Sequence, residues 1–422
     1  MPLQIFCCFL IILETVTSNM SLNILKMESE YVKELKNCII KTIDDRALDL
    51  NNISQCIWEH PEICFQENYA HDLLTTFLEK EKFVVQRKTP LETAFIARYG
   101  DATGMKVGVL CEYDALPELG HGCGHNLIAE VGVATGLALK EIATIYPDLK
   151  MEVIVFGTPA EEGGGGKILM IEKGAFNETD ICMMSHPTPF EIPAPMWISC
   201  IQLTVVFKGK PAHASGAPWE GVNALDAAVN CYNGISMLRQ QIKLTSRVHC
   251  VIVDGGKVPN IIPERSELSI FIRGLVKEDT FDLANKVKQC ASGAAAATGC
   301  SVTFSETQPF YDSIKTNPTM IELYINNAKS IGVKFYGDTM ASKLIASTDM
   351  GNVSQIKPSI HPCFKIVTPA ANHTHEFTTS SGAPENQVHA LNSAKSMAMT
   401  VVDILLNPTF LEQIRKDFQN KN

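Results

Sequence analysis

Residues 107–111 read Val-Gly-Val-Leu-Cys, residues 153–156 read Val-Ile-Val-Phe, and residues 181–185 read Ile-Cys-Met-Met-Ser. Each run is short and apolar, which is typical of a buried strand. Glycine loops and helical patterns separate the runs, so the stretch from 104 to 185 predicts a mostly parallel sheet covered by helices. We therefore expect an α/β fold.

Each run is followed by side chains that can bind a metal ion or exchange a proton. In the order of the runs they are Glu112 and Asp114, Glu161 and Glu162, and His186. Between the first two runs, residues 120–126 read Gly-His-Gly-Cys-Gly-His-Asn, which sets the thiol of Cys123 two positions from the imidazole of His125. A thiolate and an imidazole suit a divalent transition metal. Because the carboxyl ends of parallel strands meet at one edge of a sheet, we expect these side chains to form a single site.

The composition is that of an ordinary globular protein, and 422 residues are enough for two domains with a full core. The net charge of −10 argues against a nucleic-acid surface, which needs a basic face, so we expect a small-molecule partner. Apart from the adjacent Cys7 and Cys8, the fourteen cysteines are scattered singly, without the spacing of a disulfide framework. Reduced thiols favour a cytoplasmic location.

Residues 1–26 are interpreted as a leader or as the result of an alternative start at Met20 or Met27. The apolar stretch 3–13 is too short to span a bilayer, and no Lys or Arg precedes it. No Ala-x-Ala cleavage site follows it either. We expect no membrane partner, and a secreted protein is the alternative if residues 1–19 act as a signal peptide.

The pattern changes at residue 197 and again near 308, which predicts an inserted domain at 197–308. Strands near 198–205, 247–253, 267–273 and 300–306 are separated by helices at 223–241 and 280–297. This β-α-β-β-α-β order is typical of a ferredoxin-like α+β unit. Residues 27–196 and 309–422 are expected to form the two parts of the main domain, with helical patterns at 27–59, 69–82, 320–331 and 385–406.

Four motifs carry a family resemblance. They are Cys-Glu-Tyr-Asp-Ala-Leu-Pro at 111–117, Gly-His-Gly-Cys-Gly-His-Asn-Leu at 120–127, Gly-Thr-Pro-Ala-Glu-Glu-Gly-Gly-Gly-Gly-Lys at 157–167 and Lys-Pro-Ala-His-Ala-Ser at 210–215. Over about residues 28–420 the chain resembles the dinuclear zinc peptidase family of aminoacylases, carnosinases and carboxypeptidase G. Within it, the chain is similar to the amidohydrolase branch that acts on hippurate, auxin conjugates and aminobenzoyl-glutamate. Its motifs are most similar to those of the Xaa-Arg, or β-alanyl-lysine, dipeptidases.

The resemblance implies a catalytic main domain, a lid and dimerisation domain at 197–308, a homodimer, and two divalent metal ions. Zinc is the expected metal, with manganese or cobalt as alternatives. The implied metal ligands are Cys123, His125, Glu162, His186 and His373. The resemblance implies Glu161 as general base, Asp114 as the residue that orients a ligand imidazole, and His213 as a lid histidine that reaches the partner subunit's site. It also implies that Asn260 and Arg273 hold the substrate carboxylate or its surroundings.

Two positions depart from the family pattern. Asn126 stands where many relatives have aspartate, and His375 is a second candidate for the last metal ligand beside His373. Two other residues near the predicted site have roles that the sequence pattern alone leaves open. Glu112 is interpreted either as an assisting residue or as a surface-loop charge, and Lys167 receives no nucleotide role because no Ser or Thr follows it.

The expected function is metal-dependent hydrolysis of dipeptides or N-acyl amino acids, with release of a basic C-terminal residue such as Lys, Arg or ornithine. An amidohydrolase of the hippurate or aminobenzoyl-glutamate type is the near alternative. A cysteine hydrolase with Cys123 as nucleophile and His125 as base is disfavoured, because residues two apart rarely reach the required geometry. A non-catalytic binding protein is disfavoured by the intact Glu161 and the complete ligand set.

Overall fold

In the computed structural model, which describes residues 30–335 and 345–420, the larger domain is built on a six-stranded sheet in the order β1-β2-β4-β3-β5-β13. The strands are β1 (Val84–Arg87), β2 (Phe95–Gly100), β3 (Met105–Cys111), β4 (Met151–Gly157), β5 (Ile181–Met183) and β13 (Ser359–Ile360). The last four strands are parallel, while β1 and β2 are antiparallel additions at one edge. The prediction of a mostly parallel α/β sheet is confirmed.

Helices cover both faces of this sheet, because successive side chains of each strand point to opposite sides. On one face Val153 and Val155 of β4 join the larger core, and on the other Ile154 and Phe156 join a second core. The first face is covered by α2 (Ala47–Glu59), α3 (Asn68–Lys80), α4 (His125–Ile145), α8 (Pro318–Ser330), α12 (Gln387–Leu406) and α13 (Pro408–Gln419). The second is covered by α5 (Gly166–Glu172) and α10 (Met350–Ile356).

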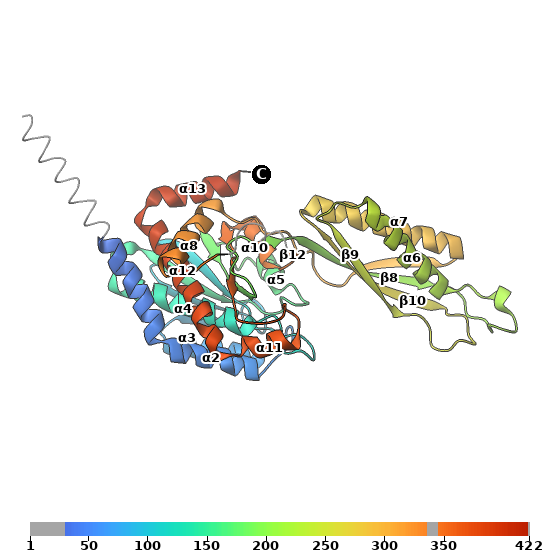
Figure 1. Cartoon of the computed structure of the whole chain (residues 1–422), viewed down its shortest axis with the longest axis horizontal. Helices are drawn as coiled ribbons and strands as arrows, with labels where there is room; N and C mark the ends of the chain where they lie inside the picture. The colour runs from blue at the N-terminus through green and yellow to red at the C-terminus, as the bar shows by residue number, and fades with distance from the viewer. Residues whose placement is uncertain (1–29, 336–344, 421–422) are drawn as a thin grey trace, which may run out of the picture.

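The second domain, here called the lid, projects from the larger domain as an arm (Figure 1). Its antiparallel sheet has the order β11-β8-β10-β9, and one face carries both of its helices. Its elements are β8 (Ser199–Lys208), α6 (Ala224–Leu238), β9 (Arg247–Asp254), β10 (Arg265–Gly274), α7 (Lys277–Thr298) and β11 (Ser301–Glu306). The observed β-α-β-β-α-β order is the predicted one. The lid has a hydrophobic core of its own, which supports our proposed boundaries of 197 and 308.

Two helices differ from the sequence prediction. The helix predicted at 27–59 is broken at Arg46, whose amide donates to Ile43 O in a tighter turn, so that a helix over 30–45 precedes α2. The sequence prediction missed α13. Asn407 caps it by accepting a hydrogen bond from the Thr409 amide, and Pro408 occupies its first turn, which is a readable helix start.

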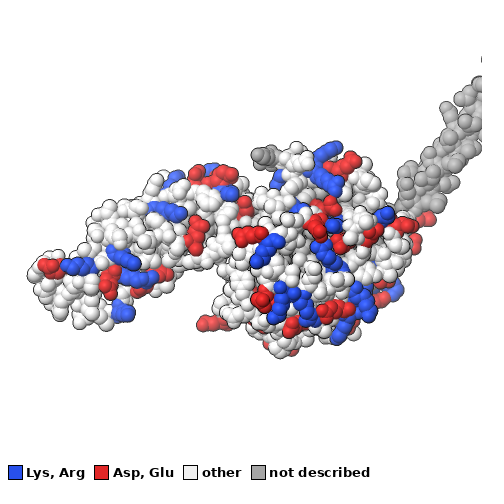
Figure 2. Space-filling view, turned by 180° about the vertical axis from the view of Figure 1, so that it is seen from behind, with Lys and Arg blue, Asp and Glu red and all other residues white. Residues whose placement is uncertain are grey.

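The predicted leader, residues 1–26, lies outside the described residues. None of the helices among the described residues is both long enough and apolar enough to cross a membrane. On the face seen in Figure 2, acidic and basic side chains are interspersed over both domains.

Close contact between α4 and β3 is made at Gly132, near the middle of α4. A Cβ atom added there would lie 2.3 Å from Cys111 Sγ and 2.9 Å from Leu110 O. Real Cβ atoms do not approach other atoms so closely, so the helix could not sit at this height above the sheet with a larger residue. The contact fixes α4, and with it the residues at its N-terminus, against the end of β3.

Gly132→Ala should therefore destabilise the protein by about 1–3 kcal/mol, the usual cost of overpacking a core. The matched control is Gly293→Ala in α7, where an added Cβ meets no atom within 4 Å. That change should stabilise by about 0.5–1 kcal/mol, because alanine loses less backbone entropy than glycine in a helix. Thermal unfolding of both variants measures the difference, and a shift in the same direction would contradict the packing argument.

Candidate metal centre

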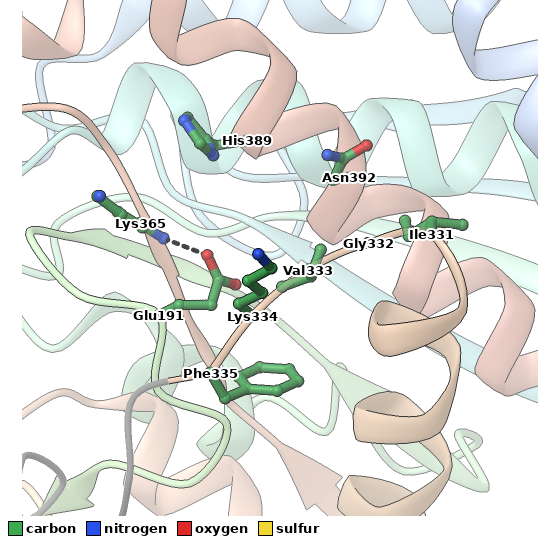
Figure 3. A pocket seen from close by; sticks show the side chains of 9 residues that line it. All are labelled: Glu191, Ile331, Gly332, Val333, Lys334, Phe335, Lys365, His389 and Asn392. Atoms are coloured by element: carbon green, nitrogen blue, oxygen red, sulfur yellow. Dashed lines mark hydrogen bonds between the residues drawn. The ribbon is translucent and has the colours of Figure 1, made fainter.

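Two sizeable cavities lie among the described residues. One, of about 430 Å³, is lined by Glu191, Lys365, His389, Asn392 and residues 331–335, and it contains none of the predicted site residues (Figure 3). The other, of about 1060 Å³, lies between the larger domain and the lid. Its lining includes five residues of the predicted site at the carboxyl ends of the strands, namely Cys123, Glu161, Glu162, His186 and His373.

The loop between β3 and α4 presents Cys123 and His125 to the second cavity. Gly124 adopts a left-handed conformation with φ 80°, and a Cβ atom there would lie 2.6 Å from Pro187 Cγ. His125 is the first residue of α4 and is fully buried. A glycine is thus required for the chain to turn sharply enough to place a thiol and an imidazole side by side.

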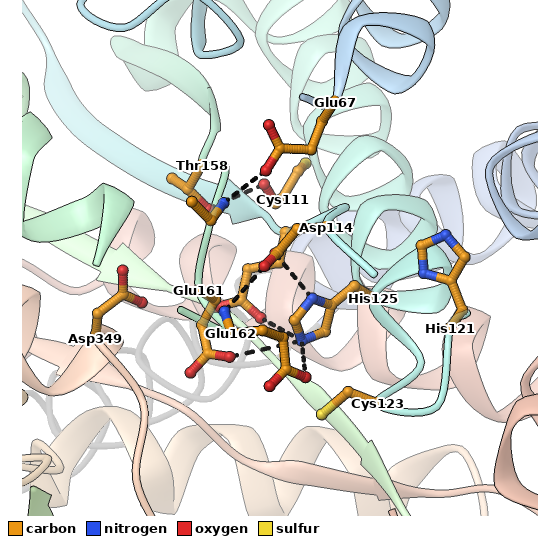
Figure 4. Close-up of polar contacts among 12 residues, drawn as sticks. Glu67, Cys111, Asp114, His121, Cys123, His125, Thr158, Glu161, Glu162 and Asp349 are labelled. Atoms are coloured by element: carbon orange, nitrogen blue, oxygen red, sulfur yellow. Dashed lines mark hydrogen bonds and ion pairs between the residues drawn. The ribbon is translucent and has the colours of Figure 1, made fainter. Parts of the chain in front are cut away.

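The orientation of His125 is fixed by Asp114. Its Nδ1 lies 3.0 Å from Asp114 Oδ1, while Asp114 Oδ2 accepts a hydrogen bond of 2.9 Å from the Glu162 amide (Figure 4). Burial lowers the pKa of His125, but the carboxylates of Asp114 and Glu112 outweigh burial and raise that pKa well above its usual range. The Nδ1–H donates to Asp114, so Nε2 is left to face the site, as in histidines that ligate metals.

Three carboxylates converge on His125 Nε2. It lies 3.5 Å from Glu112 Oε2, 3.8 Å from Glu162 Oε1 and 3.9 Å from Glu161 Oε2. Burial, followed by the charges of Glu112 and Glu162, raises the pKa of Glu161 well above its usual range. His125 Nε2, Glu112 Oε2 and Glu162 Oε1 are buried and have no hydrogen-bond partner. Buried polar atoms are rarely left unpaired, which indicates that these atoms are ligands of a cation.

Two further histidines extend the cluster. His186 Nδ1 lies 2.8 Å from Pro187 O and donates to it, which leaves Nε2 facing Cys123 Sγ at 3.4 Å. His373 Nε2 lies 3.4 Å from Glu162 Oε1. The backbone of His373 has a φ of 67° and its amide donates to Gly122 O, so the loop is tied to the Cys123 turn.

The donor atoms form four overlapping groups, in each of which all atoms lie within 4.8 Å of one another. They are Cys123-His125-His186, Cys123-Glu162-His373, His125-Glu161-Glu162 and Glu112-Glu161-Asp349. The first three combine sulfur, nitrogen and carboxylate oxygen, which is the donor set that transition-metal ions such as zinc accept. Because Cys123, His125 and Glu162 are shared between groups, the residues fit two neighbouring ions.

The structure shows where three residues with open roles in the sequence analysis lie, namely His375, Asn126 and Glu112. His375 begins α11 (His375–Ser381), is exposed, and belongs to none of the four groups, whereas His373 does. Asn126 points away from the cluster, since its amide donates to Ser54 Oγ and Ser381 O. Glu112 is fully buried, so the surface-loop interpretation of this residue is wrong.

The sequence analysis missed the basic wall that the lid contributes to the cavity. Arg273 lines the cavity, with its guanidinium 2.6 Å from Ser347 Oγ and stacked on Phe271. Arg247 of β9 is directly opposite Arg273 in the sheet register, and His249 is opposite Phe271. The alternation of side chains along a predicted strand could have placed Arg247 and His249 on one face of that strand. It could not have identified β10 as the strand with which they share this face.

The structure does not bring His213 and Asn260 into the cavity of the same chain. Both are exposed and lie together, with the Ala214 amide donating to Asn260 O. His213 follows the end of β8, whose ten residues span about 33 Å from the cavity outward, and Asn260 follows the end of β9. Figure 1 shows this end of the lid pointing away from the larger domain.

A two-domain enzyme with a buried thiol, imidazoles and carboxylates beneath a lid is a metallopeptidase by class, and comparisons with known proteins agree. A family model described as the peptidase dimerisation domain of M20 matches residues 199–298. The chain is 43% identical to mouse Xaa-Arg dipeptidase over 92% of this chain and 93% of that one. It is 28% identical to a p-aminobenzoyl-glutamate hydrolase polypeptide from Escherichia coli, over 92% of this chain and 95% of that one.

Among solved structures, the fold is similar to that of a dinuclear metal-binding M20 peptidase from Bacillus subtilis, with a TM-score of 0.67 and 20% identity. The alignment covers 86% of this chain and 99% of that one. The chain belongs to the M20 peptidase family, together with the Xaa-Arg dipeptidases.

Asp114→Asn should weaken metal binding by about 10–100-fold, because histidine ligands depend on the carboxylate behind them. Asparagine keeps the size but not the charge that orients Nδ1–H of His125. Optical titration of the metal-free protein with Co²⁺ measures the dissociation constant. Asp148→Asn, at an exposed aspartate, is the control, and equal constants in the two variants would show that Asp114 does not support a metal ligand.

Proposed function

We propose that this protein is a metal-dependent hydrolase of dipeptides or N-acyl amino acids that releases a basic C-terminal residue such as Lys, Arg or ornithine. The observation that carries the proposal is the identity with Xaa-Arg dipeptidase over nearly the whole of both chains. The donor cluster beneath the lid supports it, since such a site suits hydrolysis of an amide bond.

We propose Cys123, His125, Glu162, His186 and His373 as the residues that hold two divalent ions, with zinc as the metal and manganese or cobalt as alternatives. Bound there, the ions would polarise the scissile carbonyl and lower the pKa of water from ~15.7 toward ~7. Asp114 keeps His125 in the tautomer that exposes Nε2. Arg273, which lines the opposite wall of the cavity, is our proposed residue for holding the substrate carboxylate.

Glu161 is the proposed general base. It is buried beside the cluster, and its carbonyl oxygen accepts a hydrogen bond of 2.6 Å from Tyr311, which fixes the loop that carries it. In the reaction its carboxylate accepts a proton from the attacking water and delivers it to the leaving amine. General acid–base catalysis of this kind contributes about 100- to 10,000-fold.

A cysteine nucleophile is less consistent with the site. Burial, followed by the charge of Glu162, raises the pKa of the Cys123 thiol well above its usual range. A bound metal ion would deprotonate a coordinating thiol, whereas a metal-free cysteine nucleophile would need a lowered pKa of its own.

The basic wall favours one alternative substrate class. Of the described residues that line the cavity, only Glu161 and Glu162 are acidic, whereas Arg247 and Arg273 are basic. Two arginines side by side on neighbouring strands suit a substrate with two carboxylates, as in aminobenzoyl-glutamate. The similarity to an aminobenzoyl-glutamate hydrolase is compatible with this alternative.

Comparison of kcat/KM for β-alanyl-lysine with kcat/KM for aminobenzoyl-glutamate and hippurate decides between the dipeptidase and the amidohydrolase. We expect kcat/KM for β-alanyl-lysine to be higher by about 100-fold, the usual reach of side-chain discrimination. A higher value for aminobenzoyl-glutamate, together with a loss of about tenfold or more in Arg247→Gln for that substrate alone, would establish the alternative.

We also propose a homodimer formed through the lid. β9 is an edge strand of the lid sheet, with Val251 and Val253 exposed, and Tyr232 and Met237 of α6 are exposed as well. An apolar, unpaired edge is a ready template for a second copy. A partner bound there would let His213 reach the other subunit's site. Its Nδ1 accepts hydrogen bonds from the Ser215 and Gly216 amides, so Nε2–H is free to donate to a substrate oxygen.

Glu161→Gln and His213→Ala should each abolish turnover but leave the bound metal in place. When the two variants are mixed and their subunits exchanged, activity should return to about a quarter of the wild-type value, because half of the dimers then have one complete site. Loss of metal in Glu161→Gln would make Glu161 a ligand instead of the base. No recovery on mixing would place His213 in its own subunit's site, and activity retained by His213→Ala alone would place it outside catalysis.

A cytoplasmic location remains our proposal. It is supported by the twelve described cysteines, all of which are free. The alternative of secretion depends on residues 1–19, which lie outside the described residues.

A further inference from the structure

Lys167 is a fully buried lysine in the first turn of α5, beneath the metal centre. Its Nζ lies 2.5 Å from Glu112 Oε1 and 2.5 Å from Asp349 Oδ1, and both carboxylates are fully buried too. The Lys167 amide donates to the second oxygen of Asp349 at 2.9 Å. The three residues come from the end of β3, the start of α5 and the start of α10, so they join three separate segments.

The ammonium occupies a place that would otherwise suit a metal ion. Oxygens of Glu112, Glu161 and Asp349 lie within 4.8 Å of one another, but two of these carboxylates already bind Lys167 Nζ. A buried ammonium is costly unless it is paired and hydrogen-bonded, and here it is both. The fourth donor group is therefore a lysine site and not a third metal site.

The contact with Lys167 determines how Glu112 faces the metal centre. With Oε1 bound to Nζ, Oε2 points to His125 Nε2 at 3.5 Å and has no hydrogen-bond donor. Oε2 thus belongs to the ring of carboxylate oxygens around Nε2. If the ammonium were absent, Glu112 could rotate away from its neighbours to escape their charge.

We propose that Lys167 is a positioning residue that holds the Glu112 carboxylate against the metal-binding face of His125. The role deepens the proposed function and rests on it. Lys167 is too deeply buried to touch substrate, so it acts through Glu112 and His125.

The test uses a charge-balanced double variant, Lys167→Met with Asp349→Asn, which removes one positive and one negative charge. The single change Lys167→Met would leave two buried carboxylates uncompensated and could prevent folding, whereas the double variant leaves only Glu112 without its partner. The control is Lys173→Met, the same substitution at an exposed lysine just after α5. The measurements are Co²⁺ titration of the metal-free proteins, thermal unfolding, and kcat and KM for β-alanyl-lysine.

We expect the double variant to fold, to bind Co²⁺ about 10–100-fold more weakly than the wild type, and to lose kcat by a similar factor with KM within threefold. The Lys173→Met control should match the wild type. Unchanged or tighter Co²⁺ binding with wild-type kcat would overturn the proposal, and so would a failure of the double variant to fold, since Lys167 would then be purely structural. The titration needs no substrate, so a wild type that does not hydrolyse β-alanyl-lysine would contradict the proposed function without deciding this test.

Discussion

Mutual repulsion among buried carboxylates is the constraint around which the larger domain is organised. Glu112, Asp114 and Asp349 are fully buried, and Glu161 and Glu162 lie beside them. Ionised groups this close in a medium of low polarity are stable only when cations lie among them. The chain supplies one cation in Lys167 and leaves a set of unpaired sulfur, nitrogen and oxygen donors for others. The buried acids therefore make the stability of this domain depend on bound metal ions.

The scaffold can hold such a cluster because its elements are packed without freedom to relax. Glycines at 124 and 132 allow the Cys123 loop to turn and α4 to lie close on β3. The His125–Asp114–Glu162 chain of hydrogen bonds links the ends of two neighbouring strands. A rigid arrangement prevents the carboxylates from moving apart, which is the usual response to like charge. The lid covers this centre with a wall of opposite sign, formed by Arg247 and Arg273.

Much of the fold could be predicted from the sequence, because the strand runs and the helical periodicity are local signals. The donors Cys123, His125, Glu161, Glu162 and His186 could be gathered into one site because each directly follows a strand or a glycine turn. Lys167 and Asp349 could not, since nothing local marks a lysine for complete burial, and its partners lie 55 and 182 residues away. The choice of His373 over His375, which lies two positions further on in the same segment, comes from the family resemblance and not from a local signal. The position of Arg247 depends on the pairing of β9 with β10, which the sequence pattern does not specify.

The central claim is that the cluster around His125 binds divalent metal and that hydrolysis depends on it. The most direct measurement is the metal content of the purified protein together with the rate of β-alanyl-lysine hydrolysis, before chelation, after chelation, and after zinc, manganese or cobalt is restored. We expect about two ions per chain, loss of activity when they are removed, and recovery when they are returned. Hydrolysis that persists in the metal-free protein would contradict a metal-dependent mechanism and would favour a cysteine hydrolase with Cys123 as nucleophile.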